Sequence, residues 1–250
     1  MFQKLVVLLC VVCSQMVDAD TTNCSINNCT NCFIEGTKKD AKDIGPKFDA
    51  ELECGVNRQI NYELSAHYTY LSMSYHFDQY KYYLPGFSKY FKKMAEEEHE
   101  HAQMFMKYQN KRGGQIRLGS IPKPCCEDEK LGKGKDEKLG NVEDEKLENS
   151  EDKKLGNCDD EKWKNGAEAM KAALQMEQFI DHSLQDLHNK AHEKDDAQFQ
   201  DFLETNFLGE QVDSIKQISD YYYTLKRIGT PLGEFQFDKL VLGGGKDTEL

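Results

Sequence analysis

The sequence lacks a long hydrophobic run, an excess of positive charge and any extended alternation of apolar and polar residues. Its one apolar run of note, residues 5–13, is too short to span a bilayer. Lys and Arg number 32 against 44 Asp and Glu, and the resulting net charge of −12 disfavours nucleic acid and anionic membranes as partners. The absence of alternation argues against strands. With 38% hydrophobic residues among 250, the chain can still bury a real core.

The short apolar run has the features of a secretory signal peptide. Lys4 precedes it, and the small residues Val17 and Ala19 follow it. This order predicts a signal peptide over residues 1–19 that is cleaved near Ala19. We therefore expect a secreted protein whose mature chain has no membrane span.

Cysteine usage points to the same compartment. Of nine cysteines, seven remain after residues 1–19 are removed, and an oxidising compartment favours disulfides over a zinc site. Seven is an odd number, so one thiol stays free or joins two chains. Residues 20–48 are polar and Cys-rich, which predicts an irregular extension held by disulfides. Asn23 and Asn28 begin glycosylation sequons there, although such short motifs also arise by chance.

Helical periodicity accounts for most of the remaining chain. In the first helix Asp49 is the expected N-cap, and the apolar stripe consists of Val56, Ile60, Leu64, Tyr68, Leu71 and Tyr75. The predicted helices, the last one short, cover residues 49–80, 85–112, 160–194, 196–227 and 235–242. The fold class is therefore all-α: a four-helix bundle with a long crossover between helices 2 and 3 and a short fifth helix.

The crossover carries an acidic octad repeat. Residues 115–126 are expected to be extended, and residues 127–162 repeat the motif Asp-Glu-Lys-Leu with a period of eight. Eight residues do not make a helical stripe, and the segment is strongly acidic, so we expect a solvated loop. It is either a tolerated surface insertion or a surface tag for uptake or ion attraction. A disulfide from Cys125 or Cys126 to Cys158 would close this loop.

Acidic side chains stand among apolar ones in all four long helices. Glu63, Glu98, Glu177 and Glu210 are these residues, and each on its own could be a satisfied buried polar group. Burying an unpaired carboxylate costs several kcal/mol, so a set of four favours a shared cation. His101 follows Glu98 by three residues and lies on the same helix face. Carboxylates with one imidazole suit iron or manganese, which leaves oxygenase, peroxidase and storage functions open.

Several segments resemble the heavy-type subunit of the ferritins. They read NRQINYELSAHYTYLSMSY from Asn57, EEEHEHA from Glu96, QNKRGG from Gln109 and FLETNFLGEQV from Phe202. The resemblance covers about residues 49–125 and 160–243. It implies a ferritin-like di-iron domain over residues 49–250, interrupted by the insertion at 127–162.

The resemblance also implies a ferroxidase centre. One iron would be held by Glu63, Glu98 and His101, and the second by Glu98 and Glu177, with Glu98 bridging. Two further residues would support them, Gln211 by orienting a water and Tyr70 by a hydrogen bond. Two Fe(II) ions would bind, O2 would oxidise them, and the ferric product would move into a cavity and mineralise.

Other residues match features of the ferritin shell. Glu97 and Glu100 correspond to carboxylates that nucleate mineral, although Gln103 stands where a third acid is usual. Asp201 and Glu204 correspond to the lining of a three-fold iron channel, and without the resemblance they would be an ordinary solvated helix start. The short C-terminal helix would line the four-fold axis of a shell of 24 subunits.

Three additions distinguish the chain from cytosolic ferritins: the signal peptide, the Cys-rich extension and the acidic insertion. Together they resemble the secreted yolk ferritins of snails. The leading hypothesis is thus a secreted iron-storage protein with ferroxidase activity, used as a yolk iron store. The alternatives are a nutrient reservoir or iron carrier with little catalytic role, and a di-iron oxygenase that is not a ferritin.

Overall fold

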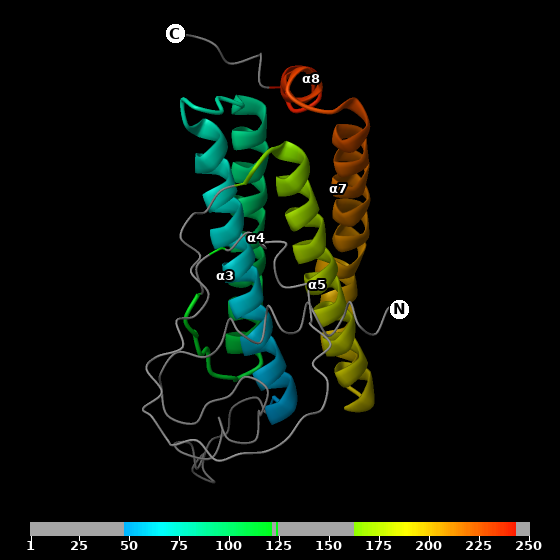
Figure 1. Cartoon of the computed structure of the whole chain (residues 1–250). Helices are drawn as coiled ribbons and strands as arrows, with labels where there is room; N and C mark the ends of the chain where they lie inside the picture. Colours follow the sequence, from blue (N-terminus) through cyan, green and yellow to red (C-terminus); the bar gives the residue numbers. More distant parts are fainter. Residues whose placement is uncertain (1–47, 122–123, 125–162, 244–250) are drawn as a thin grey trace, which may run out of the picture.

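The computed structural model describes residues 48–121, 124 and 163–243, and this part of the chain is all-α without a strand, which confirms the predicted fold class (Figure 1). The predicted signal peptide, nearly all of the Cys-rich extension with Asn23 and Asn28, and the insertion at 127–162 lie outside the described residues. The helical elements are α3 (Ala50–Asp78), α4 (Pro85–Lys111), α5 (Gly166–Glu193), α6 (Ala197–Leu203), the π-helical turn η2 (Glu204–Leu208), α7 (Gly209–Ile228) and α8 (Leu232–Leu240).

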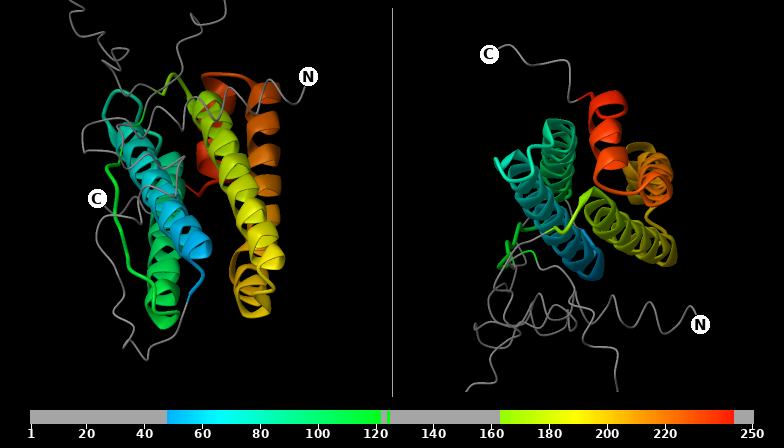
Figure 2. Two further views of the ribbon diagram at one scale, coloured as in Figure 1. Left: turned by 90° about the horizontal axis from the view of Figure 1, so that it is seen from below. Right: turned by 45° about the horizontal axis from the view of Figure 1, so that its top comes forward.

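The four long helical stretches form a bundle. α3 packs against α4 and α5, and α5 packs against α7. α4 and α5 run in the same direction, so the chain between them must return along the length of the bundle (Figure 1). α8 lies across the end of the bundle at which α4 and α5 begin (Figure 2). This topology is the predicted one, with a long crossover between the second and third long helices.

The start of the crossover is docked on α3 by side chains one helical turn apart. Glu53, Asn57 and Asn61 accept hydrogen bonds from the backbone N–H groups of Gln115, Arg117 and Gly119 at 2.8–2.9 Å. Four helical residues rise about 6 Å, and two extended residues rise about 6.6 Å, so the two repeats stay in step. These alternate contacts agree with the extended conformation predicted from residue 115 onward as far as Gly119.

Two carboxylates of α8 cap the helices beneath it. Asp238 Oδ1 accepts from the backbone N–H of Phe87 at 3.0 Å, near the N-terminus of α4. Glu234 Oε1 accepts from the backbone N–H of Gly166 at the start of α5. Negative charge at a helix N-terminus is stabilising, so these contacts attach α8 to the bundle.

The predicted stripe of α3 is partly wrong. Val56 and Ile60 are fully buried, but Tyr68 and Tyr75 are 43% and 61% exposed. Repeated four-residue steps advance about 40° beyond a full turn each time, so the predicted stripe drifts around the helix. The observed stripe corrects this drift with three-residue steps and continues through Tyr70, Met73 and Phe77.

The third and fourth predicted helices also differ from the structure. α5 begins at Gly166, six residues later than expected, because Asn165 is its N-cap and accepts from Glu168 N–H at 2.9 Å. The fourth helix is not continuous, since the π-helical turn Glu204–Leu208 interrupts it. Around the π turn the buried residues follow four-residue steps, which the wider turn accommodates without drift; they are Phe199, Leu203, Phe207 and Gln211. Beyond them the buried residues of α7 are Ile218 and Leu225, at seven-residue steps. None of the described helices is long and apolar enough to cross a membrane.

Candidate metal centre

A polar layer divides the apolar core of the bundle into two clusters. One cluster lies toward α8 and includes Tyr70, Phe91 and Ala173. The other lies toward the opposite end and includes Ile60, Phe105 and Ile180. On each of α3, α4 and α5 a glutamate occupies the boundary between the clusters. These residues are Glu63, Glu98 and Glu177, with exposed fractions of 0%, 3% and 1%.

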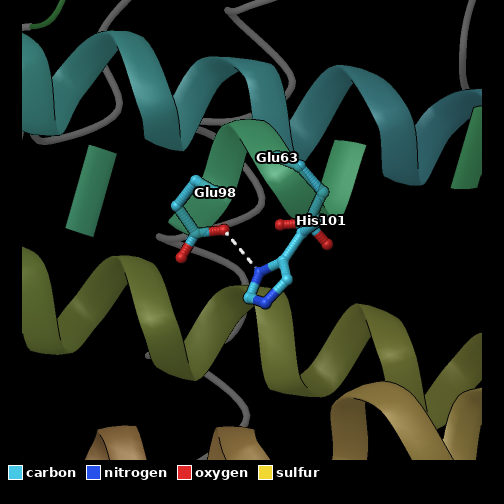
Figure 3. A group of neighbouring side chains, drawn as sticks. All are labelled: Glu63, Glu98 and His101. Carbon is cyan, nitrogen blue, oxygen red and sulfur yellow. Dashed lines mark hydrogen bonds and ion pairs between the residues drawn. The ribbon is translucent and has the colours of Figure 1, made fainter. Parts of the chain in front are cut away.

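Glu63, Glu98 and His101 come together around one point. Each offers one ligand atom, and these atoms lie within 4.8 Å of one another. Figure 3 shows the Glu98 carboxylate facing the imidazole of His101, with an Oε2–Nδ1 distance of 3.2 Å. Within the described residues this is the one group of three or more possible ligands at that spacing. The sequence-based pairing of Glu98 with His101 on one helix face is thus realised in the structure.

Glu63 is held on one side only. Its Oε1 accepts from Gln59 Nε2 at 2.8 Å, and Gln59 in turn accepts from the Ser183 hydroxyl at 2.7 Å. Its Oε2 is buried and accepts no hydrogen bond, and the Glu98 carboxyl group lies close enough to share a proton with Glu63. Neither Gln59 nor Ser183 is predicted from the sequence, although the position of Gln59, one turn before Glu63, is a signal that could have revealed it. An ionised oxygen without a donor is costly in the core, and a cation beside it removes that cost.

Glu177 forms a second cluster with Tyr70 and Gln211. The Tyr70 hydroxyl donates to Glu177 Oε1 at 2.5 Å, and Gln211 Nε2 donates to Glu177 Oε2 at 2.5 Å. Gln211 also donates to the backbone carbonyl of Glu177 at 3.1 Å, which fixes its amide. Glu177 is therefore oriented by three different helices: its own, α3 and α7.

The pKa values of the three buried glutamates are all raised, but not equally. Burial raises the pKa of Glu63 well above its ordinary value of 4.5, and the nearby Glu98 carboxylate raises it further. Burial and the charge of Glu177 also raise the pKa of Glu98 well above that value. Burial raises the pKa of Glu177 too, but the hydrogen bonds from Tyr70 and Gln211 counteract this rise. Three ionised acids in one buried layer repel each other, and bound cations would replace that repulsion with attraction between each carboxylate and the metal.

His101 connects the layer to the bundle surface. Its Nδ1 faces Glu98, and its Nε2 lies 3.4 Å from Glu210 Oε2 on α7. His101 is half-buried, whereas Glu210 is exposed. The expectation that Glu210 is a fourth buried acid is therefore wrong: it lies beside the site but not inside the polar layer. Carboxylates, one imidazole and one amide form a hard, oxygen-rich set that suits iron or manganese.

The remaining predicted residues lie apart from this layer. Glu97 is half-buried and ion-paired with Lys93 at 2.7 Å, and Glu100 is exposed. Asp201 and Glu204 are exposed, and Glu204 Oε1 lies 2.7 Å from His188 Nε2. In this single chain they line no internal site, and their predicted roles stay predictions.

Comparisons with known proteins agree with this geometry. A family model described as a ferritin-like domain matches residues 54–228. The chain is 47% identical to a soma ferritin of the snail Lymnaea stagnalis over 195 residues, which cover 78% of this chain and 92% of that protein. It is 41% identical to a ferritin heavy chain of Echinococcus granulosus over 203 residues, which cover 81% of this chain and 98% of that protein.

Proposed function

The chain belongs to the ferritin family of iron-storage proteins, and on that premise we propose that it oxidises Fe(II) with O2 at the buried layer of Glu63, Glu98, His101 and Glu177. The observation that carries the proposal is the buried Oε2 of Glu63. This oxygen accepts no hydrogen bond, and Glu63, Glu98 and His101 each have a ligand atom within 4.8 Å of those of the other two. Fe(II) is the substrate, and the ferric product is the stored cargo.

Each residue has a role that follows from its contacts. Glu63, Glu98 and His101 bind one Fe(II), and Glu177 binds a second. Glu98 is placed between the two ions because its carboxyl group interacts with Glu63 on one side and with Glu177 on the other. Each Fe(II) then gives one electron to O2, which takes up two protons and leaves as hydrogen peroxide.

Tyr70 and Gln211 orient Glu177 through their hydrogen bonds, which also counteract the rise that burial causes in its pKa. The second position offers an amide where another Glu-x-x-His motif would supply an imidazole. A weaker ligand set of this kind suits irons that must leave after oxidation.

The ferric product is then stored away from the site where it forms. The half-buried Glu97 and the exposed Glu100 are suited to start mineral growth, and the exposed Asp201 and Glu204 are suited to attract incoming Fe(II). These roles rest on the family pattern and on the solvent access of the four side chains, of which Glu97 is half-buried and the other three are exposed. An exposed acid binds a hydrated cation reversibly, which is what transfer along a path requires.

Assembly into a shell of 24 subunits is supported by apolar surface that a single chain leaves exposed. On and beside α8 these side chains are Leu232, Phe235, Leu240 and Val241, and on α3 they are Tyr68 and Tyr75. Clustered exposed apolar residues mark protein–protein contacts. Light scattering of the purified protein tests this point, and a monomer or dimer at micromolar concentration would contradict it.

Secretion as a yolk iron store is the last part of the proposal. It is supported by the signal-like residues 1–19 and by the disulfide bond of Cys54 in α3, which fits an oxidising compartment. The soma ferritin leaves about a fifth of this chain unmatched. Terminal sequencing of the protein from culture medium, before and after glycosidase treatment, tests cleavage near Ala19 and glycans at Asn23 and Asn28. An intact N-terminus inside the cells would contradict it.

Stopped-flow oxidation tests the catalytic step. Metal-free protein is mixed with Fe(II) and O2 beside the variants Glu98→Ala and Glu96→Ala. Glu96 lies two residues away on α4 and is exposed, so it is a matched control for loss of a carboxylate. We expect fast oxidation in the wild type and in Glu96→Ala, and slow oxidation in Glu98→Ala. Equal rates in all three proteins would contradict catalysis at this site and would leave the function of an iron carrier or nutrient reservoir.

A further inference from the structure

Two histidines outside the polar layer lie close enough to share a ligand. His67 lies on α3 and His99 on α4, and the centroids of their imidazole rings are 5.1 Å apart with the ring planes tilted by 43°. Neither side chain belongs to the group formed by Glu63, Glu98 and His101. The two helices pack directly against each other, so the bundle itself maintains this spacing.

A hydrogen bond fixes the orientation of the His67 ring. Its Nδ1 lies 2.6 Å from the carbonyl oxygen of Ala95, one turn before His99 on α4. A carbonyl oxygen can only accept, so Nδ1 carries the proton and Nε2 presents its lone pair. Among the described residues the ring makes no other hydrogen bond. Histidines that ligate metals usually donate their second ring nitrogen to a carbonyl in this way, which fixes the tautomer.

The separation of the rings matches two imidazoles on one ion. A nitrogen ligand lies about 2.0–2.1 Å from Zn²⁺, so a tetrahedral angle places two ring centroids about 5.2 Å apart. The observed 5.1 Å agrees with this value.

The pair is accessible from solvent, unlike the polar layer. Consecutive helical residues point about 100° apart, and accordingly Glu98 is 3% exposed whereas its neighbour His99 is exposed. His67 is partly buried between the two helices. An ion can therefore reach the pair from outside, and water can complete its coordination.

We propose that His67 and His99 form a second metal site, which binds a borderline divalent cation such as Zn²⁺ or Cu²⁺ through two imidazole nitrogens. Imidazole suits these ions, whereas carboxylate and water ligands suit Mg²⁺ and Ca²⁺. The site is separate from iron oxidation and needs no oxidation step. A metal ion bound to both histidines would also link α3 to α4 outside the polar layer.

Cu²⁺ binding to protein without the internal triad tests the proposal. The background is Glu63→Ala with His101→Ala, with the helix content checked by circular dichroism. His99→Ala and His67→Gln are then added separately. The Gln side chain can still donate to the Ala95 carbonyl, so the second variant keeps the anchoring contact. His192→Ala is the matched control, because His192 is an exposed histidine on α5.

We expect the background protein to bind one Cu²⁺ per subunit with two-nitrogen hyperfine structure in its electron paramagnetic resonance spectrum. Loss of an outer-shell partner alone weakens metal binding by about 10–100-fold, and losing either ligand should weaken it at least that much. His192→Ala should bind as the background does. No nitrogen-coordinated Cu²⁺ in the background, or equal affinity in His99→Ala, would overturn the proposal. Neither result depends on iron oxidation.

Discussion

Glu63→Gln is expected to stabilise the metal-free protein although it removes an iron ligand. The Glu63 carboxylate is fully buried and accepts one hydrogen bond, from Gln59, while Oε2 has no partner. In the variant the amide oxygen still accepts from Gln59, and the amide N–H2 can donate to the Glu98 carboxylate. A repulsion between two acids is thereby replaced by a hydrogen bond.

The magnitude follows from these contacts. A hydrogen bond to a charged group contributes about 1.5–3 kcal/mol, and ionising a buried carboxylate costs several kcal/mol. Allowing for imperfect geometry, we expect the free energy of unfolding at neutral pH to rise by about 1–3 kcal/mol. For a domain of this size that corresponds to an unfolding temperature about 2–12 °C higher. Differential scanning calorimetry at matched subunit concentration measures this shift.

The effect should depend on pH with a definite sign. Because burial raises the pKa of Glu63 above 4.5, the folded state holds this proton more tightly than the unfolded state does. Below about pH 4.5, Glu63 is protonated in both the folded and the unfolded state, so Glu63→Gln is no more stable than the wild type. As the pH rises through the raised folded pKa, the wild type loses stability and the difference grows to its full value.

A matched control variant and a measurement with added Fe(II) complete the test. Glu53→Gln changes another buried glutamate on α3, but Glu53 already accepts from the backbone N–H of Gln115 at 2.9 Å, so no gain is expected. Anaerobic Fe(II) should raise the unfolding temperature of the wild type and not that of Glu63→Gln. A metal-free Glu63→Gln protein less stable than the wild type at neutral pH would refute the reasoning.

Three other substitutions test separate contacts. Tyr70→Phe removes a hydrogen bond that lowers the pKa of Glu177, so the pH profile of the initial iron-oxidation rate should move to higher pH; an unchanged profile would contradict this role. Arg112→Ala breaks a two-pronged contact with Asp196 (3.1 and 2.5 Å) between α4 and α6, and urea denaturation should show a loss of about 1–3 kcal/mol rather than none. Asp238→Ala removes a cap of α4, which should cost about 0.5–2 kcal/mol and speed hydrogen exchange in α8, whereas unchanged exchange would exclude the capping role.

The internal acids could be found from sequence because they break a strong pattern. Glu63, Glu98 and Glu177 occupy core positions of otherwise apolar stripes, and each proves to be buried. Gln59 escaped notice because an amide on a helix face is common and its role depends on Ser183, which lies on another helix.

The errors in the fold have physical causes of the same kind. The sequence pattern predicts Tyr68 and Tyr75 in the core because apolar residues at four-residue steps look continuous in sequence, while the helix rotates them toward the surface. The π turn at 204–208 contains no proline or glycine that would predict it from the sequence. It depends instead on packing along the whole fourth helix. The capping of α4 by Asp238 joins residues 151 positions apart, which no local pattern can indicate.

An anaerobic titration of metal-free protein with Fe(II) tests the central claim most directly. If the buried acids form an iron site, a pair of Fe(II) ions should bind per subunit with a sharp end point, and near-infrared circular dichroism should report their ligand field. Glu98→Ala should abolish this end point, while Glu96→Ala should keep it. Uptake without a stoichiometric end point, or an end point that Glu98→Ala leaves unchanged, would contradict the account.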